Sequence, residues 1–393
     1  MNIVINALSA RRGGGQTYLR NLLEHGEARD GLKIFMLAPD SLDLPHERDI
    51  ERIRVRWPTG NPVLRAVWER FFLPRLLKET NADVLFCPGG VLNTIPPEGC
   101  KTVTMFRNMI PFDPVARASY PPGPERVRNW LLERAMMKAM TRADLVIFLS
   151  NFARDIIEER AAGRIGTDMT IPHGLGRQFM VPQGEGRPRP SWLPEREYLL
   201  YVSYLAAYKH HLEVVRGFHL LKQRRGTAEA LVLAGNSRSP YGNRVRGEIE
   251  RLGLQDDVLV TGDVPHQELP GAYYHAKINI FASGCENCPN ILLEALGAGR
   301  PMAVSNRPPM PEFGGNAVVY FDPRSPEDFA DKLVSFIDDP AHMAALSARA
   351  RERSAMYDWG ETALRTWNAI RNLGGRKDAK QSGNNLSRQP ITA

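Results

Sequence analysis

The sequence has few cysteines and no long apolar run. Four cysteines occur in 393 residues, too few for a disulfide framework in a chain of this length. Nowhere do about 18 apolar residues follow one another, so no segment is expected to cross a membrane as a helix. A strand-like segment, 2–6, begins directly after Met1 and leaves no room for a signal peptide. Together these features predict a cytoplasmic protein.

Motifs typical of metal and nucleic-acid binding are also lacking. The pair Cys285-x-x-Cys288 has no second Cys or His pair at ligand spacing, so we interpret it as small residues in a tight loop. No zinc-finger, RNP or basic-zipper pattern occurs, which argues against nucleic acid as a partner. We therefore expect no metal and no cofactor. The net charge of +7 then favours a phosphorylated substrate or an anionic membrane surface.

Short apolar runs alternate with helical patterns along the chain, which predicts parallel βαβ units. In the first half we expect strands at 2–8, 32–38, 83–87, 101–106 and 144–149, and helices at 16–25, 62–79 and 124–141. The second half repeats the rhythm, with strands at 198–202, 229–234, 257–261, 277–282 and 301–305, and helices at 210–224, 243–253, 266–275 and 289–298. The expected fold class is therefore α/β, with two doubly wound, Rossmann-like sheets.

A stretch rich in Pro, Gly and Arg separates the two halves and has the composition of a linker. We therefore expect an N-terminal domain, a linker, a C-terminal domain, a helix that crosses the hinge and a disordered tail, at 1–180, 181–197, 198–357, 358–373 and 374–393. Ligands of open α/β sheets bind at the carboxyl ends of the strands. Two such domains facing each other across a cleft would hold one substrate each.

Two glutamates follow a predicted strand of the second half. Glu286 lies in a polar loop, and Glu294 lies inside a helix whose first turn suits Pro289. The free N–H groups of that turn favour a diphosphate or sugar hydroxyls. Two carboxylates at this spacing can accept hydrogen bonds from two parts of one ligand. A solvated loop glutamate and an ordinary helix glutamate are an equally good interpretation of the spacing alone.

This glutamate pair, with the following Ala295-Leu296-Gly297-Ala298-Gly299-Arg300-Pro301, resembles the signature of glycosyltransferase family 4 (group 1). The resemblance extends over residues 1–370 and is strongest at 198–306. It implies the GT-B fold, with two Rossmann-like domains facing each other across a cleft. It also implies metal-independent transfer of a sugar from a nucleotide-diphosphate donor, with retention of anomeric configuration.

The resemblance also implies roles for residues of the second half. Glu294 would bind the donor ribose hydroxyls, and Glu286 would lie beside the donor sugar. Backbone N–H groups near Glu286 would hold the sugar hydroxyls, and the donor-binding candidates in this stretch are Asn287, Pro289, Asn290 and Ile291, of which Pro289 itself has no N–H. The family often has Gly-Phe-Gly after the first glutamate, where this chain has Asn-Cys-Pro. That difference concerns the identity of the sugar more than the fold.

Lys209 follows the strand 198–202 and matches a lysine of the family. It would neutralise the charge that builds on the leaving diphosphate, an effect of about 2–4 kcal/mol per group. The family's Gly-Arg or Gly-Ser pair is replaced by Ser203-Tyr204. Without the resemblance, Lys209 would be interpreted as a surface lysine. The nucleobase is expected beside the turn 261–264, with Gly262 and Val264 as its contacts.

The first half offers a glycine-rich loop between a strand and a helix. The resemblance implies that Gly14 and Gly15 of this loop contact the donor phosphate, and a purely structural turn is the alternative. Arg107 and Asn108 stand where many relatives have His-Asp. Arg107 could steady a phosphate or contact the acceptor, but an arginine is not assigned the role of a general base. His173 lies between Pro and Gly and is expected to be structural.

We therefore expect a hexosyltransferase that uses a nucleotide sugar bound at 198–320 and a glycan or lipid-linked acceptor bound at 1–180, in the assembly of a surface polysaccharide. A nucleotide-sugar epimerase and a non-catalytic nucleotide-sugar-binding protein are the alternatives. Helices 62–79 and 124–141 interleave basic and apolar residues, which is typical of helices that dock on an anionic membrane. Two ordinary helices, each with its apolar face in the core, would have the same composition.

Overall fold

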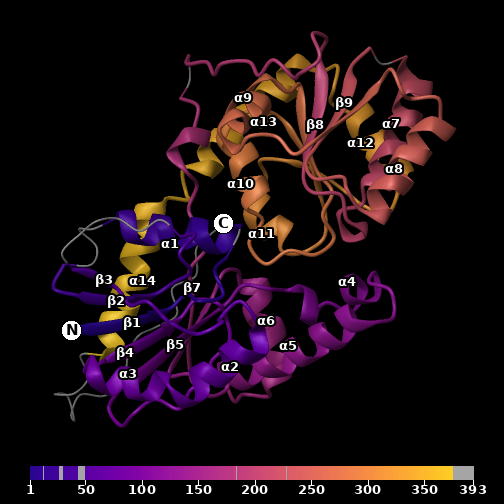
Figure 1. The fold of residues 1–393 in the computed structure, drawn as a ribbon. Coiled ribbons are helices and arrows are strands. Elements are labelled where there is room, and N and C mark those ends of the chain that lie inside the picture. The colour runs from indigo at the N-terminus through magenta and orange to yellow at the C-terminus, as the bar shows by residue number, and fades with distance from the viewer. Residues whose placement is uncertain (12, 26–29, 43–48, 183, 227, 375–393) are drawn as a thin grey trace.

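Every strand pair in the two sheets is parallel. The computed structural model describes residues 1–11, 13–25, 30–42, 49–182, 184–226 and 228–374, and these residues form two lobes (Figure 1). The strand order is β3-β2-β1-β4-β5-β6-β7 in the first lobe and β10-β9-β8-β11-β12-β13 in the second. Helices cover both faces of each sheet. The predicted α/β class with two doubly wound sheets is confirmed.

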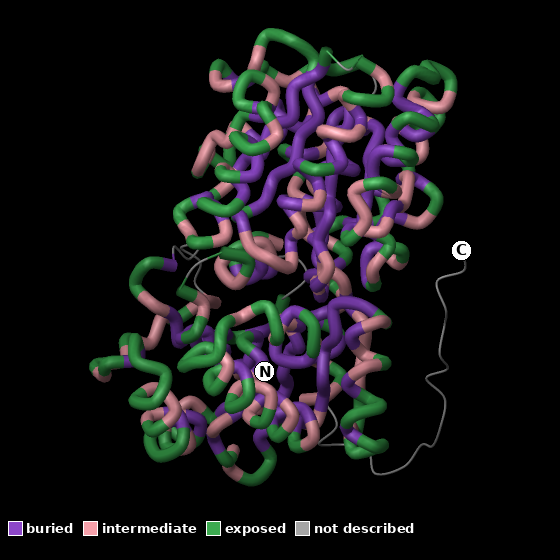
Figure 2. The backbone as a smooth tube through the Cα atoms, turned by 90° about the vertical axis from the view of Figure 1, so that its right-hand side faces the viewer, coloured by how far each residue is buried: buried purple, intermediate pink, exposed green. Residues whose placement is uncertain are grey.

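In the first lobe the strands are β1 (Asn2–Asn6), β2 (Lys33–Leu37), β3 (Ile50–Arg52), β4 (Val84–Cys87), β5 (Lys101–Phe106), β6 (Leu145–Phe148) and β7 (Thr167–Thr170). Its helices are α1 (Gly14–Glu24), α2 (Pro62–Phe71), α3 (Leu73–Glu79), α4 (Pro114–Ala118), α5 (Pro124–Met140) and α6 (Asn151–Ala161). The central strands β4 and β6 are buried along their whole length, because helices cover both faces. Figure 2 shows such buried segments through the centre of both lobes.

In the second lobe the strands are β8 (Tyr198–Val202), β9 (Ala230–Ala234), β10 (Val258–Gly262), β11 (Ile278–Phe281), β12 (Met302–Ser305) and β13 (Val319–Phe321). The helices are α7 (His211–Arg225), α8 (Pro240–Arg251), α9 (Leu269–His275), α10 (Asn290–Gly297), α11 (Met310–Gly314), α12 (Pro326–Val334) and α13 (Pro340–Ser354). One apolar core runs through this lobe on both sides of the sheet. The segment predicted as a linker packs on this lobe, since Arg187 O lies 2.7 Å from His275 Nε2.

The sequence pattern was incomplete at the sheet edges and in the helical layers. It did not predict the short edge strands β3, β7 and β13, or the helices α4, α6, α11, α12 and α13. The predicted helix 62–79 is two helices, α2 and α3. Pro74 is at the start of α3, and its missing N–H removes the hydrogen bond that would have continued α2.

The chain returns from the second lobe to the first at its C-terminal end. Helix α14 (Trp359–Gly374) lies among the elements of the first lobe (Figure 1). Trp367 is fully buried there, and its indole N–H donates to Leu22 O at 3.2 Å. Gly374, predicted to begin a disordered tail, is the last residue of this helix. The rest of the predicted tail, 375–393, lies outside the described residues.

Two chain segments lie side by side where the lobes join. Leu175 N donates to Tyr357 O at 2.9 Å, on the path from the first lobe to the second. Gly174 is adjacent, and a Cβ there would lie 2.3 Å from Trp359 N. Only glycine allows this approach of two backbones. The connection between the lobes is therefore double and tightly packed.

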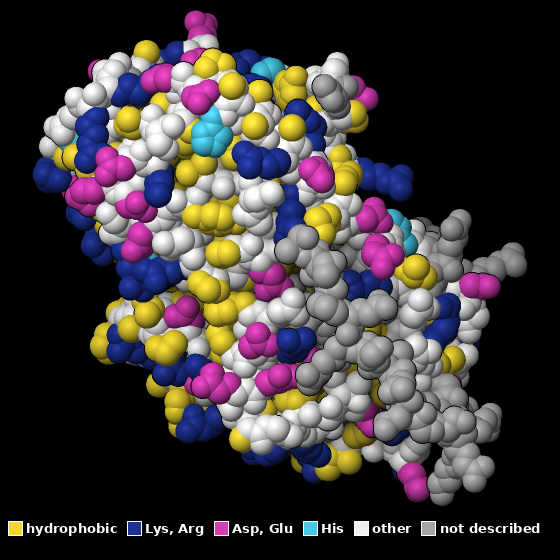
Figure 3. Space-filling view, turned by 180° about the vertical axis from the view of Figure 1, so that it is seen from behind, with side chains coloured by type: hydrophobic (Ala, Val, Ile, Leu, Met, Phe, Trp, Pro, Cys, Tyr) yellow, Lys and Arg dark blue, Asp and Glu magenta, His cyan; other side chains and the backbone are white. Residues whose placement is uncertain are grey.

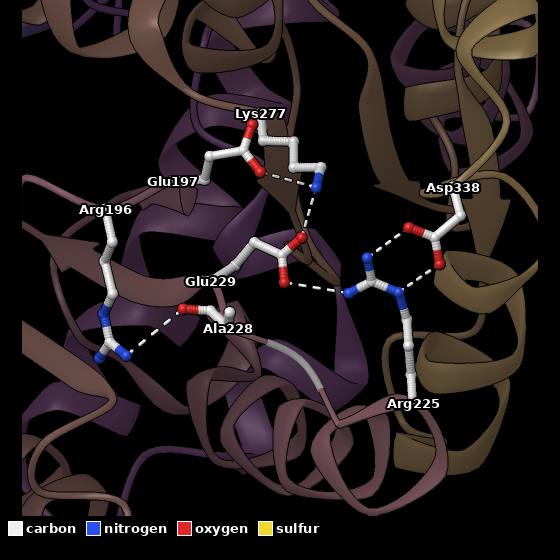
Figure 4. A network of polar contacts seen from close by, with 7 residues as sticks. All are labelled: Arg196, Glu197, Arg225, Ala228, Glu229, Lys277 and Asp338. Atoms are coloured by element: carbon white, nitrogen blue, oxygen red, sulfur yellow. Dashed lines mark hydrogen bonds and ion pairs between the residues drawn. The ribbon is translucent and has the colours of Figure 1, made fainter.

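A network of charges closes the amino end of the second sheet (Figure 4). Glu229, just before β9, is 3% exposed and accepts hydrogen bonds from Lys277 and from Arg225, the latter at 3.0 Å. Lys277 also contacts Glu197 at 2.8 Å, and Arg225 contacts Asp338. These residues precede β8, β9 and β11 or flank helices, so the network fixes the strand starts at the end of the sheet opposite the carboxyl ends.

Replacing Glu229 by alanine should lower the free energy of unfolding by about 3 kcal/mol, because it leaves two half-buried cations with fewer partners. Urea denaturation followed by circular dichroism measures the loss. Glu195→Ala, an exposed glutamate before β8, is the matched control and should change stability by less than about 0.5 kcal/mol. Equal effects of the two substitutions would show that the network does not stabilise the lobe.

Candidate active site between the two lobes

Both sheets reverse their strand order at one point. The reversal lies between β1 and β4 in the first lobe and between β8 and β11 in the second. Loops that leave the carboxyl ends on either side of such a reversal run to opposite faces and leave a crevice that binds ligands. The segment after β8 carries Lys209, the loop after β11 carries Glu286, and α1, which follows β1, begins at Gly14. The topology therefore gathers predicted site residues from both lobes.

Lys209 and Glu286 form an ion pair across the reversal in the second sheet. The Lys209 ammonium donates to Glu286 Oε1. Lys209 is 4% exposed, and its ammonium lies 5.3–5.7 Å from the ring centres of Phe281, Tyr204 and Tyr208. Its interpretation as a surface lysine is therefore wrong. Because the charge is buried, the carboxylate and the aromatic faces stabilise it in place of water.

Two tyrosines beside this pair were not predicted. The hydroxyls of Tyr204 and Tyr208 contact each other. Tyr204 is 50% exposed, and burial of its hydroxyl raises its pKa, so it is a neutral donor at physiological pH. Tyr204 stands in the pair that replaces the family's Gly-Arg. This chain therefore has tyrosine hydroxyls at the position where the family commonly has an arginine. In the sequence, only the four-residue spacing between Tyr204 and Tyr208 indicated that the two rings could lie together.

Glu294 on α10 is held by two side chains from another segment. Tyr273 on α9 donates its hydroxyl hydrogen to Glu294 Oε2 at 3.3 Å, and His266 Nε2 lies 3.6 Å from Oε1. The hydrogen bond to Glu294 raises the pKa of His266 above its ordinary value. Tyr273 is 1% exposed and orients the carboxylate. Nothing in the sequence pattern had pointed to Tyr273 or His266.

The amino end of α10 lies between the two glutamates. Pro289 was predicted to lie in the first turn of this helix. It is instead the residue before the helix, because Asn290 is the first helical residue. No described side chain caps the helix, and Asn290 N donates to Cys288 O at 3.0 Å, so the N–H groups of Ile291 and Leu292 remain available to a ligand. The N–H of Ile291 belongs to this turn, while its side chain packs on the core of the lobe.

Asn290 and His173 contact each other from different segments. His173 Nδ1 lies 3.0 Å from Asn290 Oδ1, and the imidazole is stacked between Tyr18 and Trp359, each at 5.4 Å. Burial lowers the pKa of His173 to about 3, so the ring is neutral at physiological pH. A neutral, stacked imidazole supports the structural role expected for His173. It connects α1, α14 and the amino end of α10.

The first lobe brings Arg107 and the glycine loop to the same place. Arg107 Nη2 donates to Gly14 O at 2.5 Å, and a Cβ on Gly14 would lie 3.5 Å from Arg107 Nη2 and 3.8 Å from Asn290 Nδ2. Gly15 lies similarly close to Arg107. None of the carboxylates in the described ranges forms an ion pair with Arg107. Its charge is therefore available to an anion between the lobes.

The side chains of Asn108 and Asn287 have local partners. Asn108 Oδ1 accepts from Ile110 N at 3.2 Å and so begins the next turn. Asn287 Nδ2 donates to Phe106 O at 2.9 Å, across the lobes. A further contact across the lobes joins α11 to α6, where the Glu312 carboxylate accepts from Asn151 N at 2.7 Å and Phe152 N at 3.1 Å. The lobes are therefore joined directly beside the site.

A polar cavity of about 340 Å³ opens at the carboxyl ends of β9 and β10. Gly262 lines it with a φ of 74°, and Val264 packs on the core just beyond. The cavity lies at the turn predicted to contact the nucleobase. Among the described residues no group of three or more His, Cys, Asp or Glu side chains could hold a metal ion.

Comparison of the sequence with models of known protein families identifies the family of this chain. The model described as "Glycosyl transferases group 1" matches residues 184–353, and the model described as "Glycosyltransferase Family 4" matches residues 12–167. One match covers each lobe. The chain belongs to glycosyltransferase family 4.

Individual relatives of this family 4 chain are distant. O-antigen chain mannosyltransferase B of Escherichia coli is 24% identical over 259 residues, which are 63% of this chain and 65% of that protein. Sucrose-phosphate synthase of Thermosynechococcus elongatus has a TM-score of 0.74 at 18% identity, over 95% of this chain and 99% of that one. The Anabaena protein HepE in complex with UDP-glucose has a TM-score of 0.68 at 14% identity, over 95% and 100%.

These likenesses differ in what they establish. At such identities the solved structures show the GT-B fold of this family 4 chain, which confirms the predicted arrangement of two facing lobes. The alignments with the first three curated relatives span 45–65% of the length of those proteins. Donor, acceptor and reaction are therefore argued from the site.

Glu294→Ala should weaken the binding of a nucleoside diphosphate by about 1–3 kcal/mol, because a ribose hydroxyl pair would lose its acceptor. Isothermal titration calorimetry measures the change. Glu250→Ala, on the exposed face of α8, removes the same charge outside the site and should leave the affinity unchanged. Wild-type affinity in Glu294→Ala would mean that this carboxylate does not bind the ribose.

Proposed function

We propose that the chain is a retaining, metal-independent hexosyltransferase that uses a nucleotide-diphosphate sugar. The observation that carries the proposal is the arrangement of Lys209, Glu286 and Glu294 around the uncapped first turn of α10. A cation and free helix N–H groups suit a diphosphate, and the carboxylates suit sugar and ribose hydroxyls. The complex of HepE with UDP-glucose supports a nucleotide sugar as the ligand of this fold.

In the proposed reaction, charge moves from the sugar to the leaving diphosphate. Lys209 and the amino end of α10 would stabilise the negative charge that grows on the phosphate, an effect of about 2–4 kcal/mol per group. Glu286 contacts the same ammonium, so it would lie close to the bond that breaks. Its carboxylate would then stabilise the positive, oxocarbenium-like sugar. Because these groups are fixed before the donor binds, little reorganisation accompanies the reaction.

The acceptor in this proposal binds the first lobe, beside Gly14, Gly15 and Arg107. Arg107 has no described counter-charge and would contact a phosphate of the donor or of the acceptor. The likeness to an O-antigen chain mannosyltransferase supports a glycan or lipid-linked acceptor in surface-polysaccharide assembly. The retaining outcome is part of the proposal and rests on the family.

A second part of the proposal is that the first lobe docks on the cytoplasmic face of a membrane. Helix α2 exposes Val63 and Phe71 to 69% and 71%, and α5 exposes Trp130 and Leu131 to 45% and 55%. Figure 3 shows basic and hydrophobic side chains side by side over the part of the lower lobe that carries α4 and α5. In the described part of the chain no helix is long and apolar enough to span a bilayer.

A groove of about 450 Å³ lies among these side chains. It is lined by Val63, Phe71 and Ile95 on the apolar side and by Arg70, Lys138 and Arg142 on the basic side. Apolar side chains could enter the headgroup region while the cations contact anionic lipids, at about 1 kcal/mol per cation. In an ordinary helix the apolar face would be buried in the core, but α2 leaves Val63 and Phe71 exposed. This exposure favours the membrane over the plain structural interpretation.

Liposome flotation tests the docking. The wild-type chain should float with anionic vesicles at low salt, bind them several-fold less at high salt and bind neutral vesicles weakly. The double variant Val63→Ser, Phe71→Ser should lose most of this binding. Val334→Ser on α12, a 43% exposed valine of the other lobe, is the control. Equal and negligible binding to both vesicle types would contradict the docking and leave the transferase proposal in place.

Product analysis separates the proposed transfer from its alternatives. Incubation with a panel of nucleotide sugars and acceptors, followed by mass spectrometry, should show a glycosylated acceptor and a free nucleoside diphosphate. An isomerised donor would indicate an epimerase, and an unchanged donor would indicate a binding protein. Lys209→Met should abolish the product while Glu250→Ala should not, because only Lys209 contacts the site.

Chelation tests the part of the proposal that concerns metal. EDTA should leave the rate of transfer unchanged, because Lys209 and the N–H groups of α10 would neutralise the diphosphate. The assay compares the rate with excess EDTA, with EDTA followed by Mg²⁺ or Mn²⁺, and without additions. A rate that falls on chelation and returns with the divalent ion would disprove metal independence.

A further inference from the structure

The cavity at the ends of β9 and β10 has walls of opposite charge. Asp263 contributes a carboxylate, and Arg238 contributes a guanidinium from the loop after β9. Neither side chain forms an ion pair with a described residue. A ligand that offers hydrogen-bond donors on one edge and acceptors on another would satisfy both groups.

The cavity walls are held in place by their own hydrogen bonds. Asn236 Nδ2 donates to Asp263 Oδ2 at 2.8 Å, so Oδ1 of this carboxylate remains to accept from a ligand. The Arg246 guanidinium donates to the carbonyl and the hydroxyl oxygen of Ser237, which is 2% exposed. This fixes the loop that carries Arg238. Asp263 and the backbone that carries Arg238 are therefore positioned before a ligand arrives.

The cavity adjoins the place where the proposed function puts the ribose. Glu294, the proposed ribose acceptor, lies 3.6 Å from His266 in the loop after β10. That loop begins at Asp263, directly after Gly262 at the end of β10, and both residues line the cavity. One short loop therefore connects the proposed ribose position with the cavity, so a base attached to that ribose would enter the cavity with its outer edge toward Asp263 and Arg238.

We propose that the base of the donor is guanine and that this cavity binds it. The inference rests on the proposed function, since it assigns the base of the same donor. Guanine carries two neighbouring donors, N1–H and N2–H₂, which match a carboxylate. Its acceptors O6 and N7 match an arginine, which is the commonest specific partner of guanine. The cavity thus offers Asp263 to one edge and Arg238 to the other.

The other common bases complement this cavity less well. Uracil has one N–H between two carbonyl oxygens, so a carboxylate that accepts from it also faces a carbonyl oxygen and is repelled. Adenine has an amino group where guanine has O6, so its donor would meet the donors of Arg238. Cytosine presents one amino group next to an acceptor nitrogen. Guanine alone has two adjacent donors together with two acceptors.

Calorimetry of the full chain with four nucleoside diphosphates tests the inference. GDP should bind about tenfold or more tightly than UDP and ADP, which corresponds to the discrimination of one good bidentate contact. Inosine diphosphate lacks only the N2 amino group of guanine. It should bind about five- to tenfold more weakly than GDP, since Asp263 loses one donor.

The variant Asp263→Asn should remove the difference between GDP and inosine diphosphate. Asn236 Nδ2 needs an acceptor, so the new amide would turn its oxygen to Asn236 and its N–H₂ group to the base. Both nucleotides should then weaken, because both lose the N1–H contact, and GDP should weaken by a further factor of about five to ten, because it also loses the N2 contact. Because this result is a ratio of two ligands, partial misfolding would not change it. Asp256→Asn, an exposed aspartate at the other end of β10, is the matched control and should keep the wild-type ratio.

The variant Arg238→Ala should have a different signature. Inosine keeps O6 and N7, so both nucleotides should weaken by the same factor, about tenfold, and their ratio should stay as in the wild type.

Three other outcomes overturn different statements. Tighter binding of UDP or ADP than of GDP would overturn guanine as the base and leave the transferase proposal intact. If the chain prefers GDP, but the ratio of its affinities for GDP and inosine diphosphate is the same in Asp263→Asn as in the wild type, the base does not bind in this cavity. Failure of the wild-type chain to bind any of the four would contradict the proposed function itself.

Discussion

A lysine that leaves water needs a counter-charge, and the site of this protein is organised around that constraint. Lys209 is buried among aromatic rings, so Glu286 must lie against it. The pair joins the loop after β8 to the loop after β11, the two strands at which the sheet reverses. It therefore fixes the path into α10, whose free N–H groups and Glu294 follow from the same loop. A sugar diphosphate would meet charges whose positions are already set.

The second lobe does not hold this site alone. Asn290 contacts His173, Asn287 donates to Phe106 O, and Glu312 caps the amino end of α6. Each contact uses a polar group at the start of a helix or the end of a strand, where backbone groups lack partners within their own element. The lobes therefore meet through the same termini that bind ligands. A change in the angle between the lobes would alter the site directly, because Arg107 and Asn290 lie on different lobes.

The sequence predicted the parts of this structure that depend on local pattern. Strands such as β4 and β6 are covered on both faces and appear as apolar runs, whereas β7, with Thr167, Asp168 and Thr170, is a half-buried edge without such a run. Lys209 and the glutamate pair were found from the resemblance to a family. Tyr273, His266 and the Arg238 side of the cavity were not, because each contact joins segments that only the fold brings together, although the turn 261–264 on the other side of the cavity was predicted as the place of the nucleobase. The break between α2 and α3 had a signal in Pro74, which the predicted helix 62–79 ignored.

The position of helix α14 affects how the protein folds during synthesis on the ribosome. The face of the first sheet that holds Ile3 and Ile5 is covered in part by Trp367 and Ile370, from the far end of the chain. Domains commonly fold in the order in which they emerge during synthesis. The first lobe emerges first, but part of its apolar surface stays exposed until α14 leaves the ribosome. By then all the residues of the second lobe's own core have been synthesised. The exposed apolar surface of the nascent first lobe is therefore a surface that chaperones would bind. Truncation before Trp359 would destabilise the first lobe, although the second lobe is nearer to the truncation in sequence.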